Sequence, residues 1–222
     1  MKKVLFVLTS HDKLGDTGKK TGFYLPELTH PFKVLNDAGI NIDFISPKGG
    51  EAPIDGVDLA DEVNVNFLNN QNNKKAIENT LTPDQIDHNN YDAIYFVGGH
   101  GTMWDLPDNS KIQEITAKIY EKGGVVAAVC HGPVGLVNVK LSDGSYLIAG
   151  KQVSCFTDEE ERAVKLDKQV PFLLESKMKE RGAIHTKAEN FVKHVVVCKK
   201  LVTGQNPASA YGVGEEILKL IS

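Results

Sequence analysis

The chain of 222 residues contains little cysteine and little tryptophan, three of the first and one of the second. An odd, sparse set of cysteines argues against a disulfide framework, so we expect a reducing compartment and a cytoplasmic protein. No apolar run approaches the roughly 18 residues that a membrane-spanning helix needs, so no membrane partner is expected. The charges also lack a strong bias, because 25 basic and 29 acidic residues leave a net charge of −4. That balance gives no electrostatic reason to expect nucleic acid as a partner.

The length is long for one domain and short for two, so we expect a single domain over residues 1–222. The apolar stretch near the N-terminus covers only residues 4–8, and no small-residue cleavage site follows it. We therefore interpret it as a first strand and not as a signal peptide. Residues 48–90 and 139–190 are polar and fit the pattern described next less well. We interpret both as insertions that form walls of a site.

Short apolar runs rich in β-branched residues alternate with helical patterns along the rest of the chain. Strands are predicted over residues 3–9, 41–46, 93–99 and 125–130, with paired strands within 194–204. Helices are predicted over residues 25–38, 109–121, 131–139 and 209–222. Continuous apolar strands between helices are typical of a buried parallel sheet. The sequence therefore predicts an α/β fold in which a mostly parallel sheet is covered by helices on both faces.

Cys130 ends the predicted strand over residues 125–130, and His131, Gly132 and Pro133 follow at once. A strand, a sharp turn and a helix start would place the thiol at the sheet edge, as in a nucleophile elbow. The N-terminus of that helix should lower the thiol pKa toward the thiolate form, which is the nucleophile. A free cysteine is also often a small buried core residue, and spacing alone leaves both interpretations open.

The sequence offers one candidate base and two further cysteines as possible reactive groups. His131 is the candidate base, although a histidine at a helix start that bonds to a carbonyl group is the alternative. Cys155 and Cys198 sit in strand-like apolar runs without an adjacent base, so we interpret them as core residues.

Several segments occur in an order that resembles the ThiJ/PfpI superfamily. They are TG followed by PELTHPF, then FVGGHGTMWDLP, GGVVAAVCHGP, FTDEEE, VPFLLE and LVTGQNPASA. This ordered set, which spans nearly the whole chain, is similar to the heat-shock chaperone branch, whose members act as glutathione-independent glyoxalases of the glyoxalase III type. The resemblance implies a flavodoxin-like fold, related to class I glutamine amidotransferases, and an enzyme that needs no cofactor.

The resemblance also implies roles for two acids near Cys130. Glu27 matches the acidic residue that contacts the nucleophilic cysteine and serves as its proton partner; without the resemblance, we would interpret it as a solvated carboxylate in the first turn of a helix. Glu161 matches the acid that orients His131 and completes a Cys-His-acid triad. Three neighbouring acids compete with Glu161 for this role, namely Asp158, Glu159 and Glu160.

The loop that follows the strand at residues 93–99 is the candidate oxyanion-binding segment. Its glycines would allow backbone N–H groups to approach a developing negative charge. We expect Gly99, with His100 beside it, and the backbone N–H of His131 to bind the substrate oxygen. The alternative is an ordinary tight turn after a strand.

The function implied by the resemblance is conversion of methylglyoxal to lactate through a hemithioacetal on Cys130. The alternatives are a stress-induced holding chaperone that binds unfolded proteins, a cysteine hydrolase or deglycase, and a redox sensor. The resemblance also implies a homodimer and a small reactive aldehyde as substrate.

No metal is expected in the site. Some bacterial relatives have a metal site of two histidines and one glutamate. His100 matches one of these places, but Asn36 and Asn41 stand near the other two, and amides are poor substitutes for imidazole and carboxylate. The remaining histidines show no metal-ligand spacing.

Overall fold

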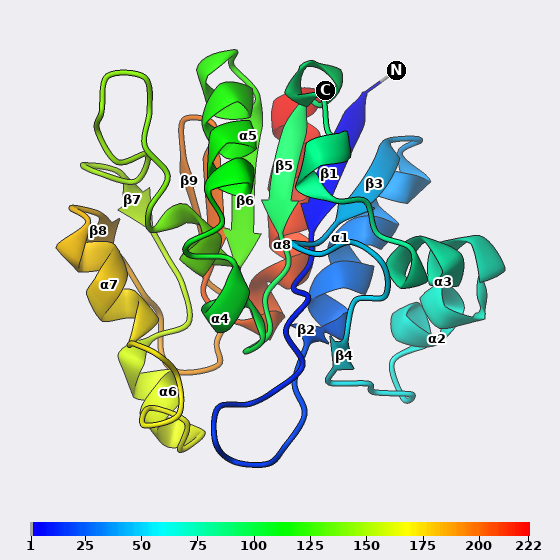
Figure 1. Ribbon diagram of the computed structural model, residues 1–222, viewed down its shortest axis with the longest axis horizontal. Coiled ribbons are helices and arrows are strands. Elements are labelled where there is room, and N and C mark those ends of the chain that lie inside the picture. Colours follow the sequence, from blue (N-terminus) through cyan, green and yellow to red (C-terminus); the bar gives the residue numbers. More distant parts are fainter. Residues whose placement is uncertain (1) are drawn as a thin grey trace.

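A six-stranded sheet runs through the centre of the computed structural model, which describes residues 2–222 (Figure 1). The strand order is β3-β1-β5-β6-β10-β9. The strands are β1 Lys3–Val7, β3 Asn41–Ile45, β5 Ala93–Phe96, β6 Val125–Val129, β9 Val195–Cys198 and β10 Leu201–Gly204. All neighbouring pairs are parallel except β9 and β10, which are antiparallel. The predicted α/β, flavodoxin-like fold with a mostly parallel sheet is confirmed, and so are the paired strands near the C-terminus.

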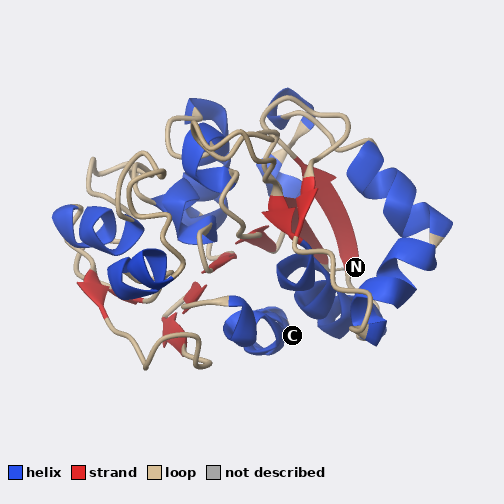
Figure 2. Cartoon of the chain, turned by 90° about the horizontal axis from the view of Figure 1, so that it is seen from below, coloured by secondary structure: helices blue, strands red, loops and turns tan. Residues whose placement is uncertain are grey.

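Helices cover both faces of this sheet, as the view from below shows (Figure 2). They are α1 Leu25–Asp37, α2 Glu62–Asn69, α3 Gln71–Glu78, α4 Thr102–Asp105, α5 Ser110–Glu121, α6 Asp158–Ala163, α7 Leu174–Glu180 and α8 Ala210–Ile221. The predicted helices at residues 25–38, 109–121 and 209–222 correspond to α1, α5 and α8, and every end agrees to within one residue. No helix within residues 2–222 combines the length and the apolar character needed to cross a bilayer.

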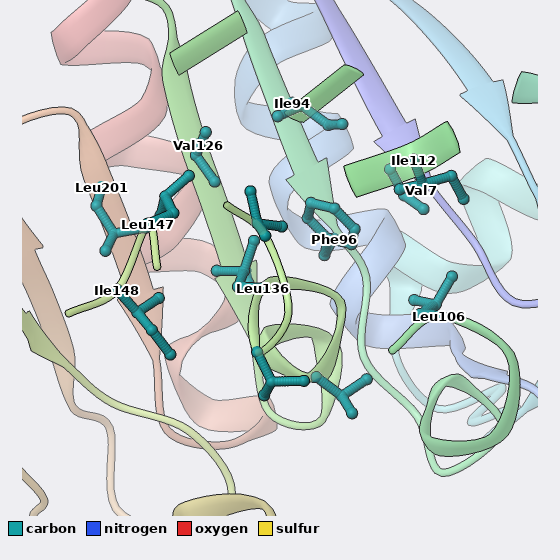
Figure 3. Packing of buried hydrophobic residues seen from close by; sticks show 14 of the residues in the cluster. Val7, Ile94, Phe96, Leu106, Ile112, Val126, Leu136, Leu147, Ile148 and Leu201 are labelled. Carbon is teal, nitrogen blue, oxygen red and sulfur yellow. The ribbon is translucent and has the colours of Figure 1, made fainter. Parts of the chain in front are cut away.

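The side chains of the central strands alternate between two apolar clusters, one on each face of the sheet. In β1, Leu5 and Val7 join the cluster that packs under α5, while Val4 and Phe6 join the cluster under α1 and α8. Figure 3 shows the first cluster, in which Phe96 of β5 lies among Val7, Ile112 and Leu136. Each fully buried side chain of this size stabilises the fold by about 1.5–3 kcal/mol. Burial on both faces explains why these strands are continuously apolar in the sequence.

The two polar stretches fold as additions at opposite sides of the sheet (Figure 1). Residues 48–90 contain β4 Ile54–Asp55, which pairs with β2 Phe23–Tyr24, followed by α2 and α3. Residues 139–190 contain β7 Gln152–Val153, which pairs with β8 Ile184–His185, together with α6 and α7. Both additions reach the end of the sheet to which the parallel strands point, where sites in such folds are found.

The segment after Cys130 differs from the prediction. It forms a 3₁₀ helix over Gly132–Leu136 and not an α-helix over residues 131–139. Two glycines and a proline within these five residues make a poor α-helix. The expectation that an α-helix begins behind the thiol is therefore wrong.

Candidate active site

Cys130 follows β6 directly and adopts a left-handed backbone conformation, with a φ of 57°. Its N–H donates to the carbonyl of Gly204 at 2.9 Å, and its carbonyl accepts from the N–H of Phe156 at 2.8 Å. Residues other than glycine adopt this conformation at a cost of roughly 1–3 kcal/mol, and the two hydrogen bonds hold it in place. The result is the sharp turn of a nucleophile elbow, which turns the thiol out of the sheet.

Three side chains form a line that begins at this thiol and ends at a buried carboxylate. The Sγ of Cys130 lies 3.4 Å from the Nδ1 of His131, and the Nε2 of His131 lies 2.6 Å from Glu161. Because an ionised carboxylate only accepts hydrogen bonds, Nε2 carries the proton and the lone pair of Nδ1 faces the sulfur. His131 therefore bonds to a carboxylate and not to a carbonyl group, which was the alternative raised from the sequence. Burial, and then the neighbouring His100, lower the pKa of His131, so the imidazole is a neutral base at pH 7.

The other three acids of the run at residues 158–161 point elsewhere. Asp158 accepts from the hydroxyl of Ser176, and Glu159 pairs with Lys187 at 2.7 Å. Glu160 caps its own helix by accepting from Thr157. Among the four acids, only Glu161 contacts His131.

His100 also bonds to Glu161, a contact that sequence reasoning missed. Its Nε2 lies 2.8 Å from Oε1 of Glu161, and its ring lies 4.1 Å from that of His131 between centroids. Burial alone would raise the pKa of Glu161, but His131 and His100 outweigh it and lower that pKa to about 2. The carboxylate is thus charged at neutral pH and holds two imidazoles at once.

Glu27 lies in the first turn of α1 and is completely buried, so it is not the solvated carboxylate that the sequence left as an alternative. Its carboxyl group lies against Cys130 and Gly98, but among the described residues neither oxygen has a well-aligned hydrogen-bond partner. A Cβ atom on Gly98 would come within 2.2 Å of Oε2, so glycine leaves the room for this acid. Burial raises the pKa of Glu27 from 4.5 to about 8, and Glu27 is protonated at neutral pH.

The pKa of the Cys130 thiol is raised, whereas the sequence predicted that it would be lowered. Burial raises the pKa of Cys130 well above its usual range, and any negative charge on Glu27 raises it further. The predicted lowering by a helix N-terminus is wrong because no α-helix begins there and the side chain is almost fully enclosed. Cys130 is a protonated thiol at rest and requires a base to become a nucleophile.

A buried neutral acid has a measurable effect on stability. The pKa of Glu27 is higher in the folded than in the unfolded chain, so its contribution to stability is complete below pH 4.5 and is lost as the pH rises toward 8. The loss reaches about 1.4 kcal/mol per pH unit. We predict that Glu27→Gln removes this part of the slope. Urea unfolding across this pH range measures it, with the exposed Glu62→Gln as the matched control. Equal slopes in Glu27→Gln and wild type would show that Glu27 is ionised in the folded protein.

The loop between β5 and α4 places Gly99 in the lining of the same cavity as the thiol. Gly99 has a φ of 103°, and a Cβ atom there would come within 2.5 Å of the Gly22 carbonyl and the Tyr24 nitrogen. Within residues 2–222, the N–H groups of Gly99 and His131 do not donate to any backbone carbonyl. They are therefore available to an oxygen atom of a ligand.

A cavity of about 270 Å³ adjoins these groups. Tyr24 and Asp55 contribute polar side chains to its lining. The apolar part of the lining comes from four residues, Phe156, Val164, Phe191 and Pro207. None of these six was predicted, because they come from loops and short elements that only the tertiary fold brings together. One signal was present for Phe156, which stands two residues before the acidic run.

Three side chains at the site carry metal-ligand chemistry. Ligand atoms of His100, His131 and Glu161 lie within 4.8 Å of one another. An ion held there would replace the hydrogen bonds that orient His131, so it would compete with the base. Asn36 and Asn41 lie near the start of β3, whereas His100 follows the far end of the parallel strand β5. Placing His100 in one site with these two positions is therefore wrong.

Comparisons with known proteins show which chains this one is similar to. The chain is 35% identical to "Glutathione-independent glyoxalase HSP31" of Saccharomyces cerevisiae, over 95% of this chain and 94% of the yeast protein. It is 33% identical to "Glyoxalase 3" of Candida albicans, over 98% of each chain.

Solved structures give the same result. Rapid Encystment Protein 24 KDa of Francisella tularensis superposes with a TM-score of 0.97 at 42% identity over 100% of both chains. Glyoxalase III of Candida albicans superposes with a TM-score of 0.91 at 33% identity, over 100% of this chain and 98% of that one. The DJ-1/PfpI family profile matches residues 20–220, and the chain belongs to the DJ-1/PfpI family.

Proposed function

We propose that this protein is a glutathione-independent glyoxalase that converts methylglyoxal and water to lactate. The observation that carries the proposal is the line Cys130, His131 and Glu161, which meets a cavity where a neutral acid and two free N–H groups also lie. A thiol beside a neutral base suits addition to an aldehyde. The relatives named as glyoxalases support the choice of substrate.

The first step forms the hemithioacetal. Nδ1 of His131 accepts the thiol proton while Sγ of Cys130 attacks the aldehyde carbon. The aldehyde oxygen becomes an oxyanion, which the N–H groups of Gly99 and His131 stabilise. The imidazolium then returns the proton to that oxygen. Glu161 keeps the imidazole in the orientation and tautomer that these transfers require.

The second stage moves a proton between the two carbons. His131 removes the proton from the carbon that carries sulfur, giving an enediolate, and the hydroxyl proton passes from the former aldehyde oxygen to the former ketone oxygen. His131 then returns its proton to the former ketone carbon, which gives the lactyl thioester. Glu27 is protonated at neutral pH and cannot accept this proton, so we assign the base role to His131. The neutral carboxyl of Glu27 instead donates toward the sulfur as negative charge develops. Water then hydrolyses the thioester to lactate and the free thiol, so one carbon is oxidised and its neighbour reduced without a cofactor.

Product analysis in deuterium oxide tests this reaction. Incubation of the purified protein with methylglyoxal, without glutathione, is expected to give lactate that carries deuterium at carbon 2, detected by proton NMR. The label arises because the proton on His131 exchanges with solvent while the enediol exists. Lactate without deuterium would point to a direct hydride shift, and no lactate would remove the glyoxalase function itself.

Catalysis is expected to survive chelation of metals. The thiol is the nucleophile, the N–H groups hold the oxyanion, and the candidate metal ligands already bond to each other. We predict that dialysis against EDTA leaves the rate of lactate formation unchanged. Added zinc is expected to inhibit, because it would occupy Nε2 of His131, and EDTA should reverse this inhibition. Activity that disappeared with EDTA and returned with zinc would overturn the metal-free mechanism.

The proposal also places the protein in the cytoplasm as a homodimer with a small reactive aldehyde as its substrate. A second candidate function, holding of unfolded proteins, is favoured by the apolar side chains of Val57 and Leu59, which are 52% and 69% exposed. Exposed apolar side chains that lie close together in a loop are suited to binding apolar segments of another chain.

A further inference from the structure

The cavity beside Cys130 is larger than methylglyoxal requires. A water molecule takes up about 30 Å³ in the liquid, so the cavity volume of 270 Å³ corresponds to about nine waters, each with one non-hydrogen atom. Methylglyoxal has only five. The aldehyde must lie at the end occupied by Cys130 and Gly99, so the remaining volume faces the group attached to the ketone carbon.

Aromatic rings line that remaining volume in a row that starts at the base. The ring of Phe156 lies 4.5 Å from that of His131 and 6.3 Å from that of Phe191. Phe156 is almost fully buried, whereas Phe191 is 48% exposed. The lining also includes Tyr24 and Asp55, which contribute polar groups.

The exposed ring at the end of this row is held in place by its backbone. Phe191 has a φ of 63°, a left-handed conformation that is uncommon for a bulky residue. Its N–H donates to the buried Oε1 of Glu160 at 2.7 Å. The same oxygen also accepts from Gln205 and Asn206, and Oε2 accepts twice from Thr157. Five donors thus fix a fully buried carboxylate, which joins the loop of Phe191 to the helix of Glu161.

A strained, half-exposed aromatic residue with so many supporting bonds is pre-organised for contact with a ligand. We propose that Phe156 and Phe191 form a specificity wall for 2-oxoaldehydes whose ketone carbon carries an aryl or branched alkyl group. The inference rests on the proposed glyoxalase function and extends it to bulkier substrates. Glu160 is the positioning residue of this wall, because it fixes Phe191 and does not line the cavity.

The test compares kcat/KM for phenylglyoxal with kcat/KM for glyoxal, which has no substituent. Phe191→Ala is expected to lower this ratio by about tenfold, the scale of a lost aromatic contact plus buried apolar area. Val192→Ala is the matched control, because Val192 is the next residue, is equally exposed at 48% and does not line the cavity. It should keep the wild-type ratio. If Phe191→Ala leaves the ratio of the two kcat/KM values unchanged, or Val192→Ala lowers it equally, the proposed specificity wall is rejected.

A second measurement does not depend on glyoxalase activity. Iodoacetamide and N-benzyl-iodoacetamide both alkylate a thiol, forming a sulfur–carbon bond and releasing iodide and a proton. The ratio of their rates at Cys130, read by mass spectrometry, is expected to favour the benzyl reagent in wild type and to fall by several-fold in Phe191→Ala. If wild type turns over no 2-oxoaldehyde but still prefers the benzyl reagent, and Phe191→Ala reduces that preference, the glyoxalase function is rejected and the specificity wall is kept. A ratio that Phe191→Ala does not change would reject the wall itself.

Discussion

Cys130→Ala is expected to lower kcat/KM for methylglyoxal by about 10⁴-fold or more, which is the scale on which removal of a covalent nucleophile acts. No neighbouring group can replace it, because Cys155 is fully buried elsewhere and Cys198 lies in β9. The measurement is lactate formation followed enzymatically or by NMR. The truncation is small and the left-handed backbone at this position is held by two hydrogen bonds, so the variant should fold.

Cys198→Ala is the matched control and should retain the wild-type rate. Substantial lactate formation by Cys130→Ala would remove the covalent mechanism. The same variant separates the two candidate functions, because suppression of aggregation of an unfolded client protein does not need the thiol. Retained suppression together with lost lactate formation would show that both functions exist and that they use different surfaces.

Glu161→Gln is expected to lower kcat by about 10³–10⁴-fold, as loss of the acid of a triad does elsewhere. A carboxylate accepts from the Nε2 groups of both His131 and His100, whereas an amide must present its NH₂ group to one of them. The imidazole of His131 then loses the tautomer in which Nδ1 faces the sulfur. Stopped assays of lactate formation, with circular dichroism to verify folding, measure the effect.

The pH profile of kcat/KM distinguishes the role of Glu161 in orienting His131 from a general loss of structure. The charge of Glu161 raises the pKa of His131, so its removal lowers that pKa. The acid limb of kcat/KM should therefore move to lower pH in Glu161→Gln, although the rate is small. Glu159→Gln, which affects only a surface pair with Lys187, should keep the wild-type rate and profile. A profile that did not move would mean that another group is the base.

The sequence predicted those parts of the molecule that depend on local pattern. Runs such as residues 125–129 are apolar throughout because both faces of β6 are covered, and a pattern of that kind is visible without coordinates. The position of Cys130 at the end of that strand was equally visible. The choice among the acids of residues 158–161 depended on resemblance, because four consecutive acids carry no spacing signal.

The remaining features depend on the tertiary structure. The pKa of Cys130 follows from burial against Glu27, which the local helix signal could not reveal. The contact of His100 with Glu161 joins two segments 61 residues apart. Phe191 lines the cavity from a backbone in a rare conformation, and its N–H bonds to Glu160. Pairings of this kind have no periodicity in the sequence.

The insertion of β10 between β6 and β9 also affects the order in which the protein folds. The N–H of Cys130 donates to Gly204, and β6 pairs with β10, so the nucleophile elbow depends on a strand that is distant in the sequence. Contacts between distant segments form later than local ones, because closing a long loop costs entropy. The left-handed backbone of Cys130 therefore gains its hydrogen bond to Gly204 only when β10 docks between β6 and β9.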